Sequence, residues 1–149
     1  MEKNGYMETV LAAAEKAAAA GEVPVAAAII SPDGRQLALT ENRMIRDCNA
    51  LHHAEILAIN RAIQIMGSPR LEGCDIWVSL EPCVMCAGAI AHARLRRLYF
   101  AANDAKAGAV ESHIQFFDQK ACNHKPEIYS GIGAEKSERM LKAFFINRR

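Results

Sequence analysis

Two short motifs combine the residue types that metal-assisted hydrolysis requires. His53 stands two residues before Glu55. Further along the chain, Cys83 stands three residues before Cys86. An imidazole and two thiolates are typical ligands of Zn²⁺, and a catalytic zinc site leaves the fourth corner of its tetrahedron to water. We therefore predict one zinc ion per chain, bound by His53, Cys83 and Cys86.

The spacing of these residues sets conditions on the local backbone. Cys83 and Cys86 fall at an expected helix start, where residues three apart share one face and the positive helix end favours thiolates. Residues two apart on a regular helix face different ways. His53 and Glu55 can therefore converge only if they straddle the first turn of their helix. There Glu55 would be the catalytic general acid/base beside the attacking water.

A structural zinc site without catalysis is the alternative for the same ligands. Such a site usually takes a fourth protein ligand from a second cysteine or histidine pair. His52 is poorly placed to bind the same ion as its neighbour His53. The other three histidines stand alone in the sequence: His92, His113 and His124. Glu55 also has no purpose in a purely structural site, so the residues favour catalysis.

Hydrophobic periodicity and turn residues predict the elements that hold these motifs. Helices are predicted over 6–20, 53–66, 83–93 and 137–147. Strands are predicted over 23–30, 36–40, 75–80 and 95–101, the first two forming a hairpin. The segment 103–133 has weak signals, with one short helix near 112–117. Strands that alternate with helices in one chain of this length predict a single α/β domain, 1–149, of two or three layers.

Composition and charge narrow the class of protein. Hydrophobic residues make up 51% of the chain and charged residues 23%, as in globular proteins rather than disordered ones. The formal net charge of +1 gives no global basic field. Basic residues do cluster at Arg94, Arg96 and Arg97 and at the chain end, where they would bind phosphate or simply be solvated.

The N-terminus and the cysteines indicate a compartment. Glu8, Glu15 and Lys16 interrupt the alanine-rich start of the chain, which therefore predicts an amphipathic helix rather than an export signal. Five cysteines without such a signal do not indicate a disulfide framework. No apolar run reaches the length that crosses a membrane. We therefore expect a cytoplasmic protein with no membrane association.

Segments spread along nearly the whole chain form a recognisable pattern: Glu22–Val25, Asn42–Arg43, His53–Ile56, Leu80–Ala89, Asp104–Lys106, Gly108–Ala109, Asn123–His124, Tyr129–Ile132 and Phe144–Phe145. Through these segments the chain resembles the bacterial tRNA-specific adenosine deaminases, within the cytidine-deaminase-like superfamily. The zinc motifs occur in many nucleotide deaminases, whereas the Asp104–Lys106 segment and the Phe-Phe-basic end are more particular to this family. The resemblance implies a three-layer cytidine-deaminase-like fold, in which helices flank a central mixed sheet of about five strands. It also implies a homodimer that converts adenosine to inosine at the wobble position of a tRNA anticodon arm.

The same resemblance implies substrate contacts. Asn42 would hydrogen-bond the extruded nucleoside, and Asp104 and Lys106 would contact the nucleotides on either side of that nucleoside. The residues that would shape the base pocket are Pro24, Val25 and Ala54. The residues that would grip the anticodon loop are Phe145, Arg148 and Arg149. Hydrophobicity alone would instead place Phe145 in the core.

Two departures from the family pattern keep other functions open. Leu51 and His52 precede the zinc-binding histidine where the family usually has a small pair, and Ala26 stands where glycine is usual. Bulk at these positions would narrow the expected adenosine pocket or displace the anticodon backbone. A deaminase of a free nucleobase or nucleoside, of the guanine or cytosine type, is therefore the alternative. A zinc-stabilised RNA-binding module without catalysis is a third reading, against which the intact Glu55 argues.

Overall fold

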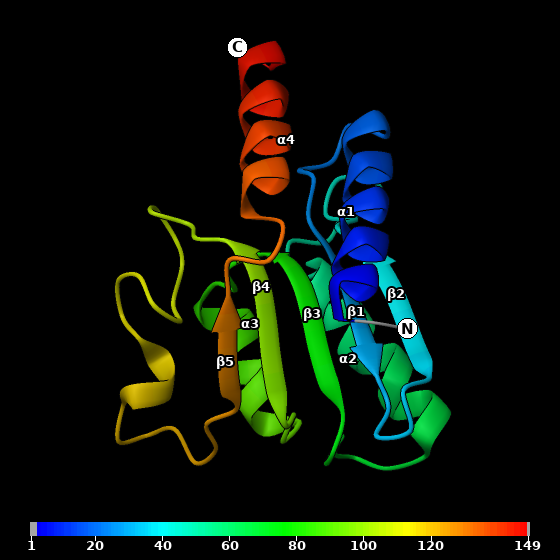
Figure 1. The fold of residues 1–149 in the computed structure, drawn as a ribbon, viewed down its shortest axis with the longest axis vertical. Coiled ribbons are helices and arrows are strands. Elements are labelled where there is room, and N and C mark those ends of the chain that lie inside the picture. Colours follow the sequence, from blue (N-terminus) through cyan, green and yellow to red (C-terminus); the bar gives the residue numbers. More distant parts are fainter. Residues whose placement is uncertain (1–2, 149) are drawn as a thin grey trace.

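The computed structural model describes residues 3–148 and contains one five-stranded sheet in the order β2-β1-β3-β4-β5 (Figure 1). The strands are β1 (Ala26–Ile30), β2 (Gln36–Glu41), β3 (Asp75–Leu80), β4 (Arg97–Ala102) and β5 (Glu127–Ser130). β1 pairs antiparallel with β2 and β3, whereas β3, β4 and β5 are parallel. The predicted mixed sheet of about five strands is confirmed.

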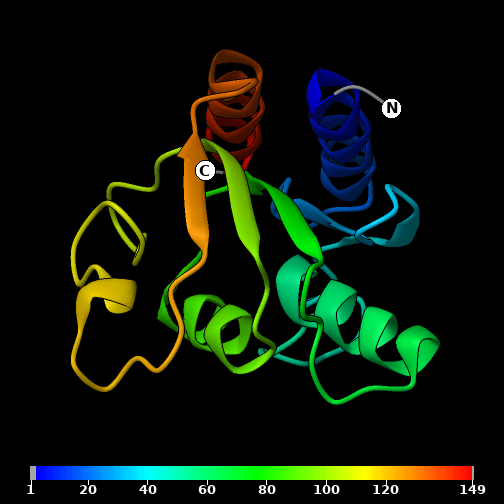
Figure 2. The same cartoon turned by 60° about the horizontal axis from the view of Figure 1, so that its bottom comes forward.

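Helices cover both faces of the sheet and make three layers (Figure 2). α1 (Lys3–Ala19) and α4 (Ala134–Asn147) lie on one face, and α2 (Ala54–Met66) and α3 (Val84–His92) lie on the other. Alternate residues of β1 enter different cores: Ala27 and Ile29 pack under α2, whereas Ala28 packs under α1. Burial on both faces explains why the central strands are continuous apolar runs in the sequence.

The structure differs from the predicted elements between residues 112 and 130. β5 was not predicted, because this edge strand is mostly exposed and so lacks a hydrophobic pattern. The helix expected near 112–117 is a short 3₁₀ turn at Phe116–Asp118. No helix of the described residues is long and apolar enough to span a membrane.

The basic cluster at 94–97 is mostly engaged within the protein. Arg96 donates two hydrogen bonds, of 3.0 and 2.8 Å, to the carboxylate of Asp75. Arg97 pairs with Glu127 at 3.3 Å. Ion pairs to residues of β3 and β5 therefore account for two of these three arginines.

Candidate active site

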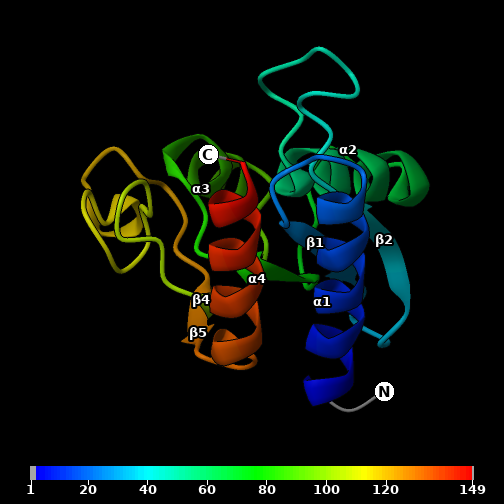
Figure 3. The same ribbon diagram turned by 90° about the horizontal axis from the view of Figure 1, so that it is seen from above.

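The carboxyl ends of β2, β3 and β4 meet at one edge of the sheet, and the predicted site lies there. Leu80 pairs with Ala102 at the ends of β3 and β4, and Glu41 at the end of β2 pairs with the first residue of β1. The connections that leave this edge carry the zinc motifs. The segment 42–53, which stands out from the ribbon in Figure 3, leads into α2, and the segment 81–83 leads into α3.

His53 meets the geometric condition that its spacing from Glu55 imposes. Its backbone is extended, with φ −70° and ψ 152°, and α2 begins only at Ala54. Glu55 lies in the first turn of α2 and is buried. Thr40 Oγ1 donates a 2.7 Å hydrogen bond to the carbonyl of Ala54, which fixes this turn to β2. Both His53 and Glu55 therefore line the same cavity.

Three potential metal ligands converge beside this cavity. His53 Nδ1 lies 3.7 Å from Cys83 Sγ and 3.6 Å from Cys86 Sγ, and all three ligand atoms lie within 4.8 Å of one another. Cys83 immediately precedes α3 and Cys86 lies in its first turn. A tetrahedral zinc site, with Zn–S of about 2.3 Å and Zn–N of about 2.0 Å, separates nitrogen from sulfur by about 3.5 Å. The three residues therefore fit a zinc ion.

The electrostatics of these groups also favour a cation. A hydrogen bond from Cys86 and a further one from His53 lower the pKa of Cys83 to about 4. The same contact with Cys83, together with burial, raises the pKa of Cys86 well above that of an ordinary thiol. Burial raises the pKa of Glu55 to about 7, and the charge of Cys83 adds to this effect. Burial and the charge of Cys83 thus oppose the anionic forms of Cys86 and Glu55, and a bound cation would favour both anions.

The cavity has a volume of about 190 Å³, which is below the roughly 300–1,000 Å³ of sites for drug-sized ligands and suits a single base. The predicted residues that line it are Val25, Asn42, His53, Ala54, Glu55, Cys83 and Asp104. The lining residues to which the sequence assigned no contact with metal or substrate are Val23, Met44, Leu80, Glu81 and Ala107. The structure thus brings most of the predicted base pocket together with the metal ligands.

Other predicted contacts lie outside the cavity. Pro24 is buried beside it, and Lys106 is exposed. Phe145 is 52% exposed on α4, so the expectation of a core position from its hydrophobicity is wrong. Arg148 stacks its guanidinium 4.7 Å from the ring centroid of Phe144. Arg149 lies outside the described residues.

The two departures from the family pattern, Leu51-His52 and Ala26, lie outside the wall of the cavity. None of them is among its lining residues. Ala26 is fully buried, and its N–H donates to Ser79 Oγ at 3.1 Å. Leu51 is 59% exposed, which places it at the surface.

His52 instead fixes the shape of the segment 42–53. Its Nδ1 lies 2.8 Å from an oxygen of Asp47, and its Nε2 lies 3.1 Å from Asn49 Nδ2. The hydrogen bond from His52 lowers the pKa of Asp47. Arg43 Nε donates to the same carboxylate at 3.1 Å. These contacts close the loop that carries Met44 to the cavity wall.

Glu81 is a buried carboxylate that positions the opposite wall. It is 2% exposed and directly follows β3. Its oxygens accept hydrogen bonds of 2.7–3.2 Å from Asn103 Nδ2, from Ser112 Oγ, and from the backbone N–H groups of Asp104, Val110, Glu111 and Ser112. A Cβ on Gly108 would lie 2.4 Å from this carboxylate, so only glycine fits there. The network holds the loop that presents Asp104 and Ala107 to the cavity.

Glu81 should also contribute to stability in a pH-dependent way. Burial alone raises its pKa, but hydrogen bonds from Ser112 and Asp104 outweigh burial and lower the pKa to about 2. Because this value lies below the ordinary 4.5, the stabilisation is present above pH 4.5 and is lost as the pH falls toward 2.

We expect Glu81→Gln to lower Tm near pH 7 by about 5 °C, and the difference from wild type to shrink below pH 4.5. Scanning calorimetry across this range measures both effects. Glu72→Gln, at an exposed glutamate, is the control and should leave Tm unchanged. A difference that stays constant with pH would show that the charge of Glu81 contributes nothing.

Comparison with known proteins agrees with this site. The whole chain, residues 1–149, matches the family described as MafB19-like deaminase. The tRNA-specific adenosine deaminase of Rickettsia bellii is 50% identical over 93% of this chain and 97% of that protein. The tRNA-specific adenosine deaminase of Agrobacterium fabrum is 44% identical over 99% of this chain and 97% of that protein.

A solved structure of a related protein has the same fold as this chain. It comes from a study of A-to-I editing by tRNA:A34 deaminases and superposes with a TM-score of 0.91 at 44% sequence identity. The match covers 93% of this chain and 100% of that structure. From its residues, its fold and these relatives, the chain belongs to the MafB19-like deaminase family and to the tRNA-specific adenosine deaminases.

Proposed function

We propose that this protein hydrolyses adenosine to inosine at the wobble position of a tRNA anticodon, with the help of one zinc ion. The observation that carries the proposal is the meeting of three zinc-type ligands and a buried carboxylate at one base-sized cavity. His53, Cys83 and Cys86 would hold the ion. When bound, zinc would make water acidic enough to act as a nucleophile near neutral pH.

Glu55 is proposed to move the protons of the reaction. The Glu55 side chain is buried and lines the cavity beside the three proposed ligands, which is the position that a general acid/base requires. Its carboxylate would accept a proton from the attacking water and deliver it to the ring nitrogen next to the reacting carbon. The second proton of the water would pass to the leaving amine, so that adenosine and water give inosine and ammonia.

Asn42 is proposed to orient the nucleoside. Its Oδ1 accepts the N–H of Met44 at 3.3 Å, which fixes the side chain at the cavity wall. No hydrogen bond to its Nδ2 is present among the described residues, so this donor can serve the substrate. Val25 and Ala54 would pack on the base, with Pro24 behind them, and an apolar wall around few polar groups is typical of such pockets.

The RNA contacts beyond the base are proposed at two places. Asp104 and Lys106 would meet the adjacent nucleotides, because their turn forms one wall of the cavity. At the second place, the end of α4 approaches the turn after α1, where a guanidinium nitrogen of Arg148 lies 3.9 Å from the position of a Cβ on Gly21. The exposed ring of Phe145 would stack on a base there, with Arg148 and Arg149 on the phosphates.

The assembly and the compartment are also proposals. The α2 and α3 layer leaves Ile65, Met66 and Val84 between 41% and 55% exposed, and a second copy of the chain would cover such a surface in a homodimer. All five cysteines are unpaired, and two of them are proposed zinc ligands. Free thiols suit the reducing cytoplasm, where we propose that the enzyme acts.

A substrate panel tests the proposed reaction. Zinc-loaded protein is incubated with an anticodon stem-loop that bears a wobble adenosine and, in parallel, with free bases and nucleosides. Inosine in the stem-loop alone supports the proposal. Turnover of a free base alone would support the alternative, a deaminase of a free nucleobase or nucleoside. RNA binding without any product would indicate a module without catalysis.

A further inference from the structure

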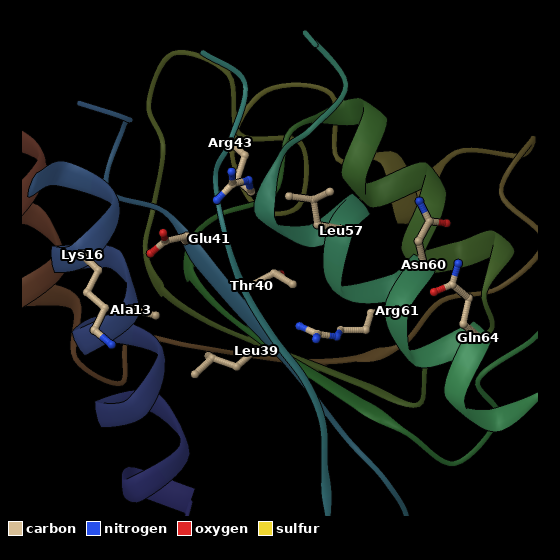
Figure 4. Close-up of a pocket in the computed structure, with 10 residues that line it drawn as sticks. All are labelled: Ala13, Lys16, Leu39, Thr40, Glu41, Arg43, Leu57, Asn60, Arg61 and Gln64. Carbon is tan, nitrogen blue, oxygen red and sulfur yellow. The ribbon is translucent and has the colours of Figure 1, made fainter. Parts of the chain in front are cut away.

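A second, open pocket lies between α1 and α2 along the edge strand β2 (Figure 4). Its volume is about 610 Å³. Four of its lining residues, at positions 57, 60, 61 and 64, form one stripe of α2, since residues three and four apart share a helix face. We refer to it as the α1–α2 pocket. It is separate from the catalytic cavity, with which it shares no lining residue.

Basic side chains enter the α1–α2 pocket from three sides. Lys16 comes from α1, Arg61 from α2 and Arg43 from the segment after β2 (Figure 4). The acidic residue of the lining, Glu41, pairs at 3.0 Å with Arg46, which also binds Glu22 at 3.2 Å. Within residues 3–148, neither Lys16 nor Arg61 has an acidic partner. Two uncompensated cations therefore face each other across one pocket.

Neutral donors beside these cations are also unengaged. Asn60 and Gln64 flank Arg61 on the same stripe of α2. In the described part of the chain, the side chains of Lys16, Asn60, Arg61 and Gln64 make no hydrogen bond. Lysine and arginine offer donors only, and the planar guanidinium matches two phosphate oxygens. The lining is therefore suited to phosphate.

The α1–α2 pocket adjoins the catalytic cavity across a single stretch of backbone. Asn42 and Met44 line the cavity, whereas Arg43 between them lines the pocket, as expected where alternate side chains point to opposite sides. α2 also contributes to both sites, because Ala54 lines the catalytic cavity and Leu57 lines the α1–α2 pocket. A polymer with one unit in the cavity can therefore continue over this stretch into the pocket.

We propose that the α1–α2 pocket binds backbone phosphates of the RNA strand on one side of the deaminated nucleotide. This inference rests on the proposed function, because it assumes an RNA substrate. A net charge of only +1 gives the chain no general attraction for RNA, so local cations must supply it. Lys16 and Arg61 contact phosphates, and the strand leaves the cavity over Arg43, whose guanidinium is paired with Asp47 at 3.1 Å.

The double variant Lys16→Ala/Arg61→Ala tests the inference. Binding of an anticodon stem-loop is measured at several salt concentrations in a Glu55→Gln background, which prevents turnover. We expect Kd to rise about tenfold and the slope of log affinity against log salt to fall by about 1.4, the sum for two phosphate contacts to a single strand. In the active background, KM should rise while kcat at saturating RNA stays unchanged.

The matched control is Arg70→Ala/Lys120→Ala, which removes two exposed cations that lie outside both pockets. It should leave Kd and the salt slope unchanged. An equal loss in both double variants would show a net-charge effect and overturn the pocket, as would no loss in either. The binding measurements do not depend on whether inosine forms. Failure of wild type to form inosine would refute the proposed function, whereas the binding results test the pocket alone.

Discussion

Glu55→Gln is expected to lower kcat on a wobble adenosine by about 10²–10⁴-fold, which is the usual contribution of a positioned general acid/base to the rate. Glutamine keeps the size of the side chain but cannot accept or release the proton. Glu55 points into the cavity and is not one of the three converging ligands, so the metal site should remain intact. Zinc content should therefore stay at one ion per chain, and Tm should not fall.

Rates from nucleoside analysis of digested RNA, with metal analysis of the same samples, check this expectation. Glu72→Gln makes the same chemical change at an exposed glutamate and should retain full activity. Activity of Glu55→Gln within a few-fold of wild type would show that another group moves the proton. Loss of zinc together with activity would show that Glu55 supports the ligands instead.

Cys83→Ala is expected to abolish stoichiometric zinc binding and to lower Tm by roughly 10 °C. A ligand present at about 1,000 times its Kd stabilises the fold by about 4 kcal/mol, and each kcal/mol is worth about 2–4 °C in a protein of this size. The metal would join the start of α3 to the start of α2, so its loss removes a link between two core helices. A buried carboxyl would also lose its neighbouring cation.

Thermal denaturation with and without a chelator measures the effect. Wild type should fall to the Tm of the variant when zinc is removed, whereas the variant should not respond to the chelator. Cys48→Ala, at an exposed cysteine outside the site, should behave like wild type. A variant that binds one zinc ion, or a wild type whose Tm ignores the chelator, would contradict the proposed ligand set.

The sequence predicts the metal ligands of the site better than it predicts the residues that form the cavity wall. His53, Cys83 and Cys86 are recognisable because residue type and short spacing define a ligand set. Their convergence depends on the extended backbone of His53, which no periodicity predicts. Strands buried on both faces were visible as apolar runs, but the exposed β5 was not, because only its pairing with β4 defines it.

Long-range hydrogen bonds explain what the sequence did not reveal. Glu81 bonds to residues more than 20 positions away, so no local pattern marks it as the support of the cavity wall. The sequence predicts that His52 adds bulk near the pocket, whereas in the structure its ring binds Asp47 and is not among the residues that line the cavity. The α1–α2 pocket likewise joins Lys16 to Arg61, which lie on different helices.

The most direct test of the central claim is a zinc titration of the metal-stripped protein, read as inosine formed at the wobble position of an anticodon stem-loop. We predict that inosine formation is absent without metal, rises in proportion to added zinc and levels off at one ion per chain. Inosine formed at full rate by the metal-free protein would contradict the account. So would a protein that binds one zinc ion at His53, Cys83 and Cys86 and leaves the wobble adenosine unchanged.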